Sequence, residues 1–261
     1  MDKKEHDAKG DLSAEAVTGI IIDPGHGGKD GGGGTNQFWK ESNYVLQISL
    51  YQYKRFQELG IPVKITRTTD VYLSPDERTK IVRNSGMKHC ISNHVNAGGG
   101  DGAEFIHSIF SSSKMADLMA EEIKAVGQNV RRVFTRKLDN GKDYYFMHRE
   151  TGAVETVIGE YGFADSTKDD VIQLRNNQIK YAEAIVKAYC RYIGKAYQPP
   201  FIEKPVPTVS NPAPSNSTPS NTAPSGKLYK VQAGAFKDEA GAKARVEALK
   251  KVGFDAYYIL Q

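Results

Sequence analysis

Short apolar stretches alternate with amphipathic stretches along residues 18–197, and this alternation constrains the fold more than any other feature of the chain. Apolar runs typical of strands occupy residues 18–23, 63–66, 89–92, 103–110 and 156–160. Helical periodicity covers residues 43–59, 112–126 and a long segment that ends near residue 193. Ser74, Pro75 and Glu77 form a helix-capping sequence, so a further helix is predicted from there to Gly86. The alternation predicts an α/β fold in which a mixed, mostly parallel sheet carries helices on both faces.

A segment rich in Pro, Ser, Asn and Thr, residues 198–226, ends this alternation. It has no apolar period and is typical of an extended linker. After it, residues 227–261 predict a strand, a helix and a second strand, which would make a small βαβ unit. We therefore expect a large domain over residues 18–197, a linker over 198–226 and a C-terminal unit over 227–261.

The charge balance bears on the partners of the chain. A net charge of +4 and a pI near 8.8 are only mildly basic, and no dense block of Lys and Arg is present. We therefore expect no nucleic-acid partner, whereas an anionic polymer such as a cell wall suits this balance. No apolar run approaches the ~20 residues of a membrane span, so no span is expected.

Two further features concern the cellular setting. Residues 1–18 are polar and lack the apolar centre of a signal peptide, so we expect synthesis in the cytoplasm and action after release. Cys90 and Cys190 lie far apart and form no CxxC pair, which predicts two buried thiols.

Four ionisable side chains stand where the predicted strands and the first helix begin or end. His26 follows the strand at 18–23 within a Gly-rich turn, His94 follows the strand at 89–92, and Glu160 ends the strand at 156–160. Glu41 lies just before the first long helix. Because function gathers at the loops after strand ends in such sheets, these groups are expected to converge. Two imidazoles and one carboxylate suit Zn²⁺ and leave a position for water, from which a second carboxylate can take a proton.

Each of these residues also has a structural interpretation. A histidine at a strand end is commonly a hydrogen-bonded loop residue, and Glu41 is favourable in the first turn of a helix. Glu160 suits a solvated strand end, and the glycines around His26 suit a sharp turn without any ligand. The turn lacks the pattern of a phosphate-binding loop. Spacing alone leaves both interpretations open.

Five ordered motifs carry a family resemblance. They are residues 22–28 (IDPGHGG), 40–43 (KESN), 66–70 (TRTTD), 92–97 (SNHVNA) and 159–163 (GEYGF). From about residue 19 to 194 the chain resembles the zinc-dependent N-acetylmuramoyl-L-alanine amidases of the Amidase_3 type. These enzymes cleave the bond between the lactyl group of muramic acid and the first alanine of the stem peptide of peptidoglycan.

The resemblance implies roles for particular residues. His26, Glu41 and His94 match the zinc ligands of the family, and Glu160 matches its catalytic glutamate. Recurrent positions interpreted as scaffold are Arg67, Arg78 and Asn84. At residues 92–96 the usual Ser-Ile-His-Ala-Asn of the family reads Ser-Asn-His-Val-Asn here, which leaves the ligand in place.

Further residues are expected around this centre. Asp23 and Asn96 are predicted to hold the ligand loops in place. His148 and Arg149 precede the last strand, and we expect them to reach the substrate, with surface loop residues as the alternative.

The C-terminal unit resembles the first half of a SPOR peptidoglycan-binding domain, in the VQAGAF element and the helix after it. SPOR domains usually carry the βαβ repeat twice, and one repeat of about 35 residues makes a poor independent core. We therefore expect two copies to pair, giving a homodimer whose joint sheet binds glycan, with a non-functional remnant as the alternative.

Three functions are compatible with these features. The first is a zinc amidase with a wall-binding tail, acting in cell-wall lysis as a phage endolysin or a sporulation autolysin. The second is a wall-binding protein on an inactive amidase scaffold. The third is a zinc peptidase that cleaves within the stem peptide. The intact set of three ligands and a base favours the first over the second.

Overall fold

The computed structural model describes residues 17–200 and five positions near the C-terminus, residues 239, 241, 243, 246 and 247. The chain divides into two compact units, Met1–Glu203 and Lys204–Gln261. Most of the predicted linker and nearly all of the predicted βαβ unit lie outside the described residues.

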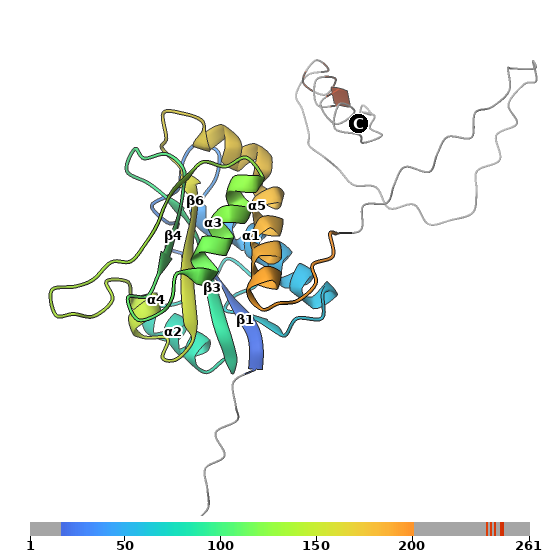
Figure 1. Ribbon diagram of the computed structural model, residues 1–261. Coiled ribbons are helices and arrows are strands. Elements are labelled where there is room, and N and C mark those ends of the chain that lie inside the picture. The colour runs from blue at the N-terminus through green and yellow to red at the C-terminus, as the bar shows by residue number, and fades with distance from the viewer. Residues whose placement is uncertain (1–16, 201–238, 240, 242, 244–245, 248–261) are drawn as a thin grey trace, which may run out of the picture. The chain divides into compact units, whose positions relative to one another are not determined.

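Six strands form one mixed sheet in the order β2-β1-β3-β6-β4-β5 (Figure 1). Their bounds are β1 (Val17–Pro24), β2 (Val63–Ile65), β3 (Met87–Asn96), β4 (Ala103–His107), β5 (Val130–Phe134) and β6 (Glu155–Phe163). Parallel pairing joins β1 to β2 and β3, β3 to β6, and β4 to β5, whereas β4 and β6 are antiparallel. The predicted mixed, mostly parallel sheet is confirmed.

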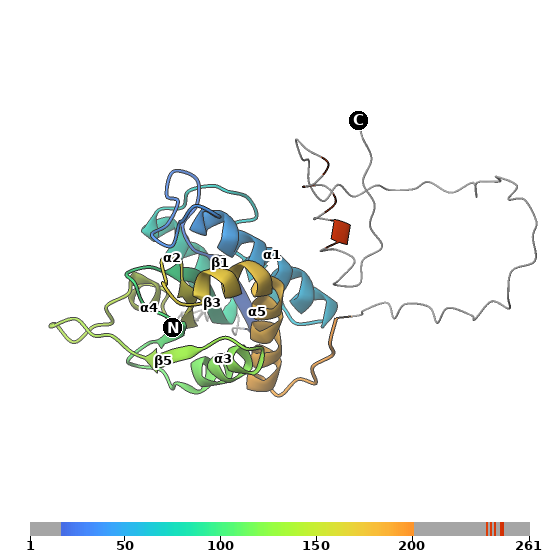
Figure 2. The same ribbon diagram turned by 90° about the horizontal axis from the view of Figure 1, so that it is seen from above.

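Helices cover both faces of the sheet, as predicted. Helices α1 (Glu41–Glu58), α3 (Lys114–Ala125) and α5 (Asp170–Tyr192) lie together on one face, and α2 (Pro75–Arg83) and α4 (Phe146–Arg149) lie on the other (Figures 1 and 2). Alternate residues of β1 divide between two apolar clusters. Ile20 and Ile22 belong to the cluster that also contains residues of α1, α3 and α5, and Ile21 belongs to the cluster that contains Val82 of α2 and Met147 of α4. A strand buried on both faces reads as a continuous apolar run.

Local signals agree with the observed elements at several points. The Ser74 side chain accepts from the backbone N–H of Glu77, and the Glu77 carboxylate accepts from the backbone N–H of Ser74, so the capping box is present. Cys90 and Cys190 are free and buried, as expected.

Two elements were not predicted, β5 and α4. The strand at 103–110 also ends earlier than expected, at His107. Two adjacent arginines, Arg131 and Arg132, interrupt the apolar pattern of β5. Such charges are common on edge strands, where they discourage pairing with other chains.

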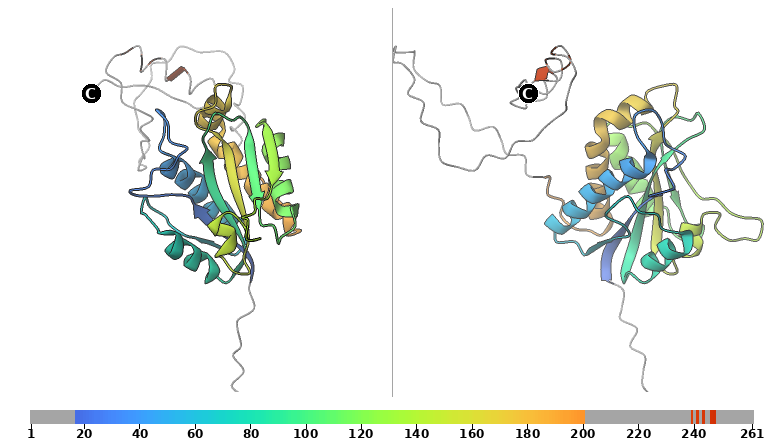
Figure 3. Two further views of the ribbon diagram at one scale, coloured as in Figure 1. Left: turned by 90° about the vertical axis from the view of Figure 1, so that its left-hand side faces the viewer. Right: turned by 180° about the vertical axis from the view of Figure 1, so that it is seen from behind.

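Three carboxyl ends of strands meet at one edge of the sheet. β1, β3 and β6 run in the same direction, so the residues that end them lie side by side (Figures 1 and 3). In the described part of the chain, no helix combines the length and the apolarity needed to cross a membrane.

Candidate metal centre

Three of the predicted ligands converge at this edge of the sheet. His26 follows β1, Glu41 is the first residue of α1, and His94 lies near the end of β3. Glu41 Oε1 lies 3.2 Å from His26 Nε2 and 3.1 Å from His94 Nδ1. The three potential donor atoms lie within 4.8 Å of one another. The imidazole rings meet edge to face, with their centroids 4.9 Å apart.

Glycines make this close approach possible. A Cβ atom at Gly25 would lie 2.2 Å from His94 Cε1, and one at Gly32 would lie 2.3 Å from Glu41 Oε2. A side chain at Gly25 or Gly32 would therefore displace His94 or Glu41. His26 itself adopts φ 57°, a left-handed conformation that turns its imidazole toward the other two residues.

The Glu41 carboxylate is buried and held by the backbone. Its Oε2 accepts from Gly34 N at 2.7 Å, and its Oε1 accepts from Val95 N at 3.0 Å. Burial acts to raise the pKa of Glu41, but hydrogen bonds and charges of His26 and His94 outweigh it, so this pKa lies well below its usual range.

Asp30 contacts a candidate ligand and was missed by the sequence interpretation. Its Oδ2 lies 2.8 Å from His26 Nδ1, on the side of the ring away from Glu41. A carboxylate on the second nitrogen of a ligating histidine fixes the ring and its tautomer. Burial acts to lower the pKa of His26, but the hydrogen bonds and charges of Glu41 and Asp30 raise it to about 9. The available signal was a carboxylate four residues after a histidine, within one Gly-rich turn.

These three residues fit a divalent metal ion. Two imidazoles and one carboxylate from three separate elements meet at one point, and backbone N–H groups and Asp30 hold them there. Zinc sites with catalytic roles use three protein donors of this kind and leave a position for water. The arrangement is therefore a candidate His/Glu metal site.

Glu160 lies beside this cluster. It is the register partner of His94 across the parallel pairing of β3 and β6. Its buried Oε2 has no hydrogen-bond partner among the residues that the structure describes. Burial raises the pKa of Glu160 to about 7; the charges of His94 and His26 oppose this shift, and those of Glu41 and Glu104 add to it. A carboxyl group with this pKa can exchange protons near neutral pH.

Asp23 supports the turn that carries His26. The buried Asp23 carboxylate accepts from Arg78 Nη1 at 2.6 Å and from hydroxyl groups of Thr66 and Ser92, both at 2.7 Å. Arg78 also donates to the backbone oxygen of His26 at 2.7 Å. Asp23 therefore acts on the ligand turn through Arg78, in the supporting position expected for it.

The other two predicted scaffold residues, Arg67 and Asn84, make hydrogen bonds to backbone oxygen atoms. Arg67 donates to the carbonyl oxygens of Gly25 and Ser42, at 2.7 and 2.9 Å, and so ties the His26 turn to the start of α1. Asn84 ends α2, where its backbone N–H reaches Lys80 O.

A buried polar network lies beneath the centre, and the sequence interpretation missed this too. Tyr161 donates to Asn93 Oδ1 at 2.7 Å and accepts from Gln52 at 3.0 Å. Asn93 in turn donates to Gln52 Oε1 at 2.8 Å and to Ser49 Oγ at 2.7 Å. These side chains join α1, β3 and β6, which also carry Glu41, His94 and Glu160. Asn93 is the residue that stands where the family resemblance led us to expect Ile.

Asn96 does not contact a ligand. Its side-chain nitrogen lies 3.1 Å from Glu104 Oε2, and its oxygen accepts from Ala97 N. Glu104 is buried and also accepts from Arg131 and Arg132. Asn96 thus joins the end of β3 to β4 rather than orienting a metal ligand.

His148 and Arg149 lie at the other end of the sheet. Both belong to α4, which precedes β6, whereas Glu160 lies toward the carboxyl end of that strand (Figure 1). His148 is buried, and burial lowers its pKa to about 4. Arg149 donates to the backbone oxygens of Asp143 and Tyr144. Burial and helix packing, rather than access to substrate, account for this pair, so their placement does not support the expected substrate contact.

Comparisons with known families match both parts of the chain. The Amidase_3 model, described as N-acetylmuramoyl-L-alanine amidase, matches residues 20–191. The SPOR domain model matches residues 222–261.

Individual relatives agree with the family match. The chain is 29% identical over 255 residues to the sporulation-specific N-acetylmuramoyl-L-alanine amidase of Bacillus subtilis, covering 93% of this chain and 84% of the relative. It is 29% identical over 247 residues to the N-acetylmuramoyl-L-alanine amidase CwlM of Bacillus licheniformis, covering 92% and 84%. Among solved structures, Cwp6 from Clostridium difficile matches with a TM-score of 0.62 and 27% identity, over 70% of this chain and 30% of that one. The catalytic domain of CwlV from Bacillus (Paenibacillus) polymyxa shares the fold, with a TM-score of 0.61 and 23% identity over 69% of this chain and 100% of that one.

Proposed function

Because the chain belongs to the Amidase_3 family of N-acetylmuramoyl-L-alanine amidases, we propose that His26, Glu41 and His94 hold a catalytic Zn²⁺ and that Glu160 is the catalytic base. The activity is hydrolysis of the amide bond between N-acetylmuramic acid and L-alanine in peptidoglycan. The observation that carries the assignment of residues is the meeting of three donor groups within 4.8 Å, beside a carboxylate whose Oε2 has no hydrogen-bond partner among the described residues.

The residues divide the chemistry between them. A bound zinc ion supplies a Lewis acid that lowers the pKa of a coordinated water from about 15.7 toward ~7. Glu160 Oε2, which is buried and accepts no hydrogen bond from the described residues, takes a proton from the attacking water. The same atom returns the proton to the leaving nitrogen of alanine. Asp30 holds the His26 ring with Nε2 turned toward the centre.

Digestion of purified peptidoglycan tests this proposal. We expect new free amino groups on alanine and no new reducing sugar ends, with release abolished by a chelator and restored by zinc. Amino groups on another stem residue would instead identify a peptidase. Retained binding without any release would favour an inactive scaffold.

Metal analysis of variants tests the ligand assignment separately. His26→Ala should lose the metal ion, because one of three donors is removed. A His26→Ala protein that still holds one zinc ion per chain would remove this residue from the ligand set. His89→Ala is the matched control, because His89 lies at the opposite end of β3 and contacts Tyr189.

For the C-terminal segment we propose a role in binding peptidoglycan glycan, supported by the SPOR match over residues 222–261. Full-length protein should then sediment with insoluble peptidoglycan more strongly than residues 1–197 alone. Pairing of two such segments stays a prediction, and sedimentation velocity on the two forms tests it. If the full-length protein and residues 1–197 are both monomeric at high concentration, pairing is contradicted.

Of the two expected settings, we propose a sporulation autolysin rather than a phage endolysin. The Bacillus subtilis relative with a sporulation-specific name aligns with 93% of this chain, which includes much of the C-terminal segment. Transcription confined to sporulating cells would be the expected result, and expression from a prophage during lysis would contradict it.

A further inference from the structure

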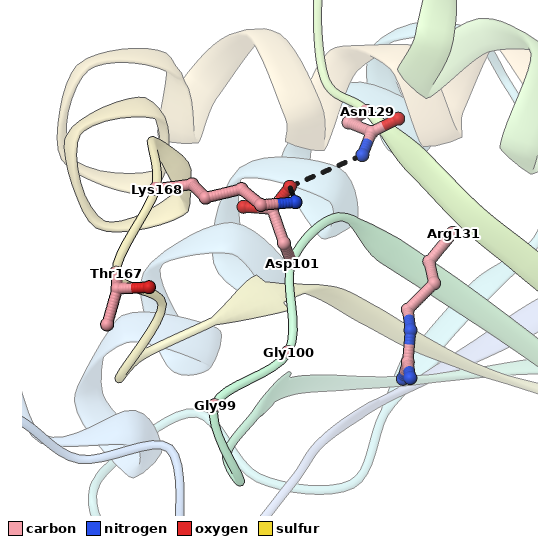
Figure 4. A pocket seen from close by; sticks show the side chains of 7 residues that line it. All are labelled: Gly99, Gly100, Asp101, Asn129, Arg131, Thr167 and Lys168. Carbon is pink, nitrogen blue, oxygen red and sulfur yellow. Dashed lines mark hydrogen bonds and ion pairs between the residues drawn. The ribbon is translucent and has the colours of Figure 1, made fainter.

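A second feature opens at the same edge of the sheet as the metal centre. It is a cavity of about 390 Å³, which is within the usual range for small-ligand sites (Figure 4). Gly99 and Gly100 follow the end of β3, Lys168 follows β6, and Asn129 and Arg131 lie at the start of β5. Along the strand order, the cavity therefore lies past β6, which carries Glu160, toward β5 and away from β1.

The sheet register places this cavity close to the catalytic centre. His94, Glu160, Glu104 and Arg132 are successive register partners across β3, β6, β4 and β5. Adjacent strands are about 4.8 Å apart, so the start of β5 lies on the order of 10 Å from the backbone of Glu160. Each extended peptide residue spans at most about 3.5 Å, and an arginine side chain reaches part of the way back. A peptide that leaves the cleaved bond toward β5 would therefore bring its second residue to the cavity.

The cavity carries two basic side chains with spare hydrogen-bond donors. Arg131 donates to Glu104 through Nη1 and lies over the Phe163 ring, 5.4 Å from its centroid. Arg131 Nε and Nη2 have no hydrogen-bond partner in the described part of the chain, and 46% of the side chain is exposed. Lys168 lies 3.4 Å from Asp101 Oδ2 and is 72% exposed.

The carboxylate of Asp101, which lines the cavity, already accepts hydrogen bonds. Asp101 accepts from Ser166 at 2.9 Å and lies 3.4 Å from both Asn129 Nδ2 and Lys168 Nζ. Figure 4 shows the Lys168 ammonium and Asn129 beside Asp101, with Arg131 across the Gly99–Gly100 segment in this view. Within the described residues, the basic groups thus keep N–H donors without partners, whereas the Asp101 carboxylate offers little further acceptor capacity.

We propose that this cavity binds the stem peptide of the substrate and that Arg131, aided by Lys168, recognises a free carboxylate on its second residue. A glutamyl residue joined onward through its side chain leaves such a carboxylate, and an amidated stem does not. Guanidinium groups pair with carboxylates through parallel hydrogen bonds. This inference rests on the proposed function, because it names the substrate form that the same site prefers.

The test uses two synthetic substrates, N-acetylmuramoyl-L-alanyl-D-γ-glutamyl-L-lysine and the same compound with the free glutamyl α-carboxyl group amidated. Full-length wild-type protein should cleave the acid with a kcat/KM about three- to tenfold above that of the amide, mainly through KM. Arg131→Gln should bring this ratio close to one. Lys168→Gln should lower it by a smaller factor.

Arg132→Gln is the matched control. Arg132 also donates to Glu104 and is similarly exposed, but it does not line the cavity. Because the readout is the ratio of kcat/KM for the acid to kcat/KM for the amide, any effect of either variant on Glu104 or on folding cancels. An unchanged ratio in Arg131→Gln, or an equal loss of preference in Arg132→Gln, would overturn the inference.

Cleavage of neither substrate by wild-type protein would instead count against the proposed function. In that case, titration of the peptide L-alanyl-D-γ-glutamyl-L-lysine and of its glutamyl α-amide, followed by NMR, decides the inference. Preference for the acid that is lost in Arg131→Gln supports the inference, and equal binding of the two peptides overturns it.

Discussion

Glu104 lies directly opposite Glu160 in the antiparallel pairing of β4 with β6. Opposed residues point to the same face of a sheet, so the buried carboxyl group of Glu104 and the half-buried one of Glu160 are neighbours here. Asn96, Arg131 and Arg132 all donate to Glu104, whereas Oε2 of Glu160 is left without a partner in the region that the structure describes. Hydrogen bonds therefore stabilise the Glu104 carboxylate, whereas Glu160 Oε2 is available to accept a proton.

Replacing this available carboxylate should separate catalysis from metal binding. Glu160→Gln keeps the size of the side chain but cannot accept a proton, so we expect kcat to fall by about 10²- to 10⁴-fold. Metal content, measured by mass spectrometry of the purified protein, should stay at the wild-type level. Turnover at the wild-type rate in this variant would rule out the role assigned to Glu160.

The carboxylate of Asp30 should matter for metal affinity. Asp30→Asn weakens the group that orients His26, so we expect zinc affinity to fall by about 10- to 100-fold in a competition assay with a chromophoric chelator. Asp70→Asn is the control, because Asp70 accepts from Gly28 N in the same turn without touching the ring. Equal losses of zinc affinity in both variants would show that the effect comes from disturbing the turn and not from losing the contact with the His26 ring.

Metal binding should release a proton from His26. Its pKa of about 9 means that the imidazole is protonated at pH 7 in the metal-free protein, and a metal ion needs the neutral form. We expect release of at least one proton per ion at pH 7 and an affinity that rises with pH up to about 9. Calorimetry in buffers of different ionisation enthalpy measures this release. An affinity that does not change between pH 7 and pH 9 would contradict it.

The buried network around Asn93 should position the ligands. Tyr161→Phe leaves Asn93 and Gln52 each without one partner, which should cost about 1–3 kcal/mol of folding stability. Because the network joins α1, β3 and β6, we also expect zinc affinity to fall severalfold.

Tyr189→Phe provides the comparison for this variant. Its hydroxyl is also buried and bonded to a side chain, that of His89, but at the other end of β3. We expect Tyr189→Phe to lower stability in chemical denaturation without changing zinc affinity. A similar loss of affinity in both variants would reduce the network to a general structural role.

Much of the architecture was predictable because it depends on local patterns. Apolar runs and capping residues mark strands and helices, and parallel strands bring their carboxyl ends to one edge whatever their order. His26, Glu41, His94 and Glu160 all stand at such ends or starts, so their approach to one another follows from chain topology. The free, buried cysteines follow in the same way from composition and spacing.

Tertiary structure alone decided which side chains meet. Whether Asp30 reaches His26, or Asn93 reaches Tyr161 across β3 and β6, depends on turn conformation and on contacts between residues distant in sequence. The burial of His148 and the edge position of β5, with its two arginines, depend likewise on how the elements pack. Sequence patterns report the periodicity of each element, whereas hydrogen bonds and cavities form only after packing has fixed the distances between elements.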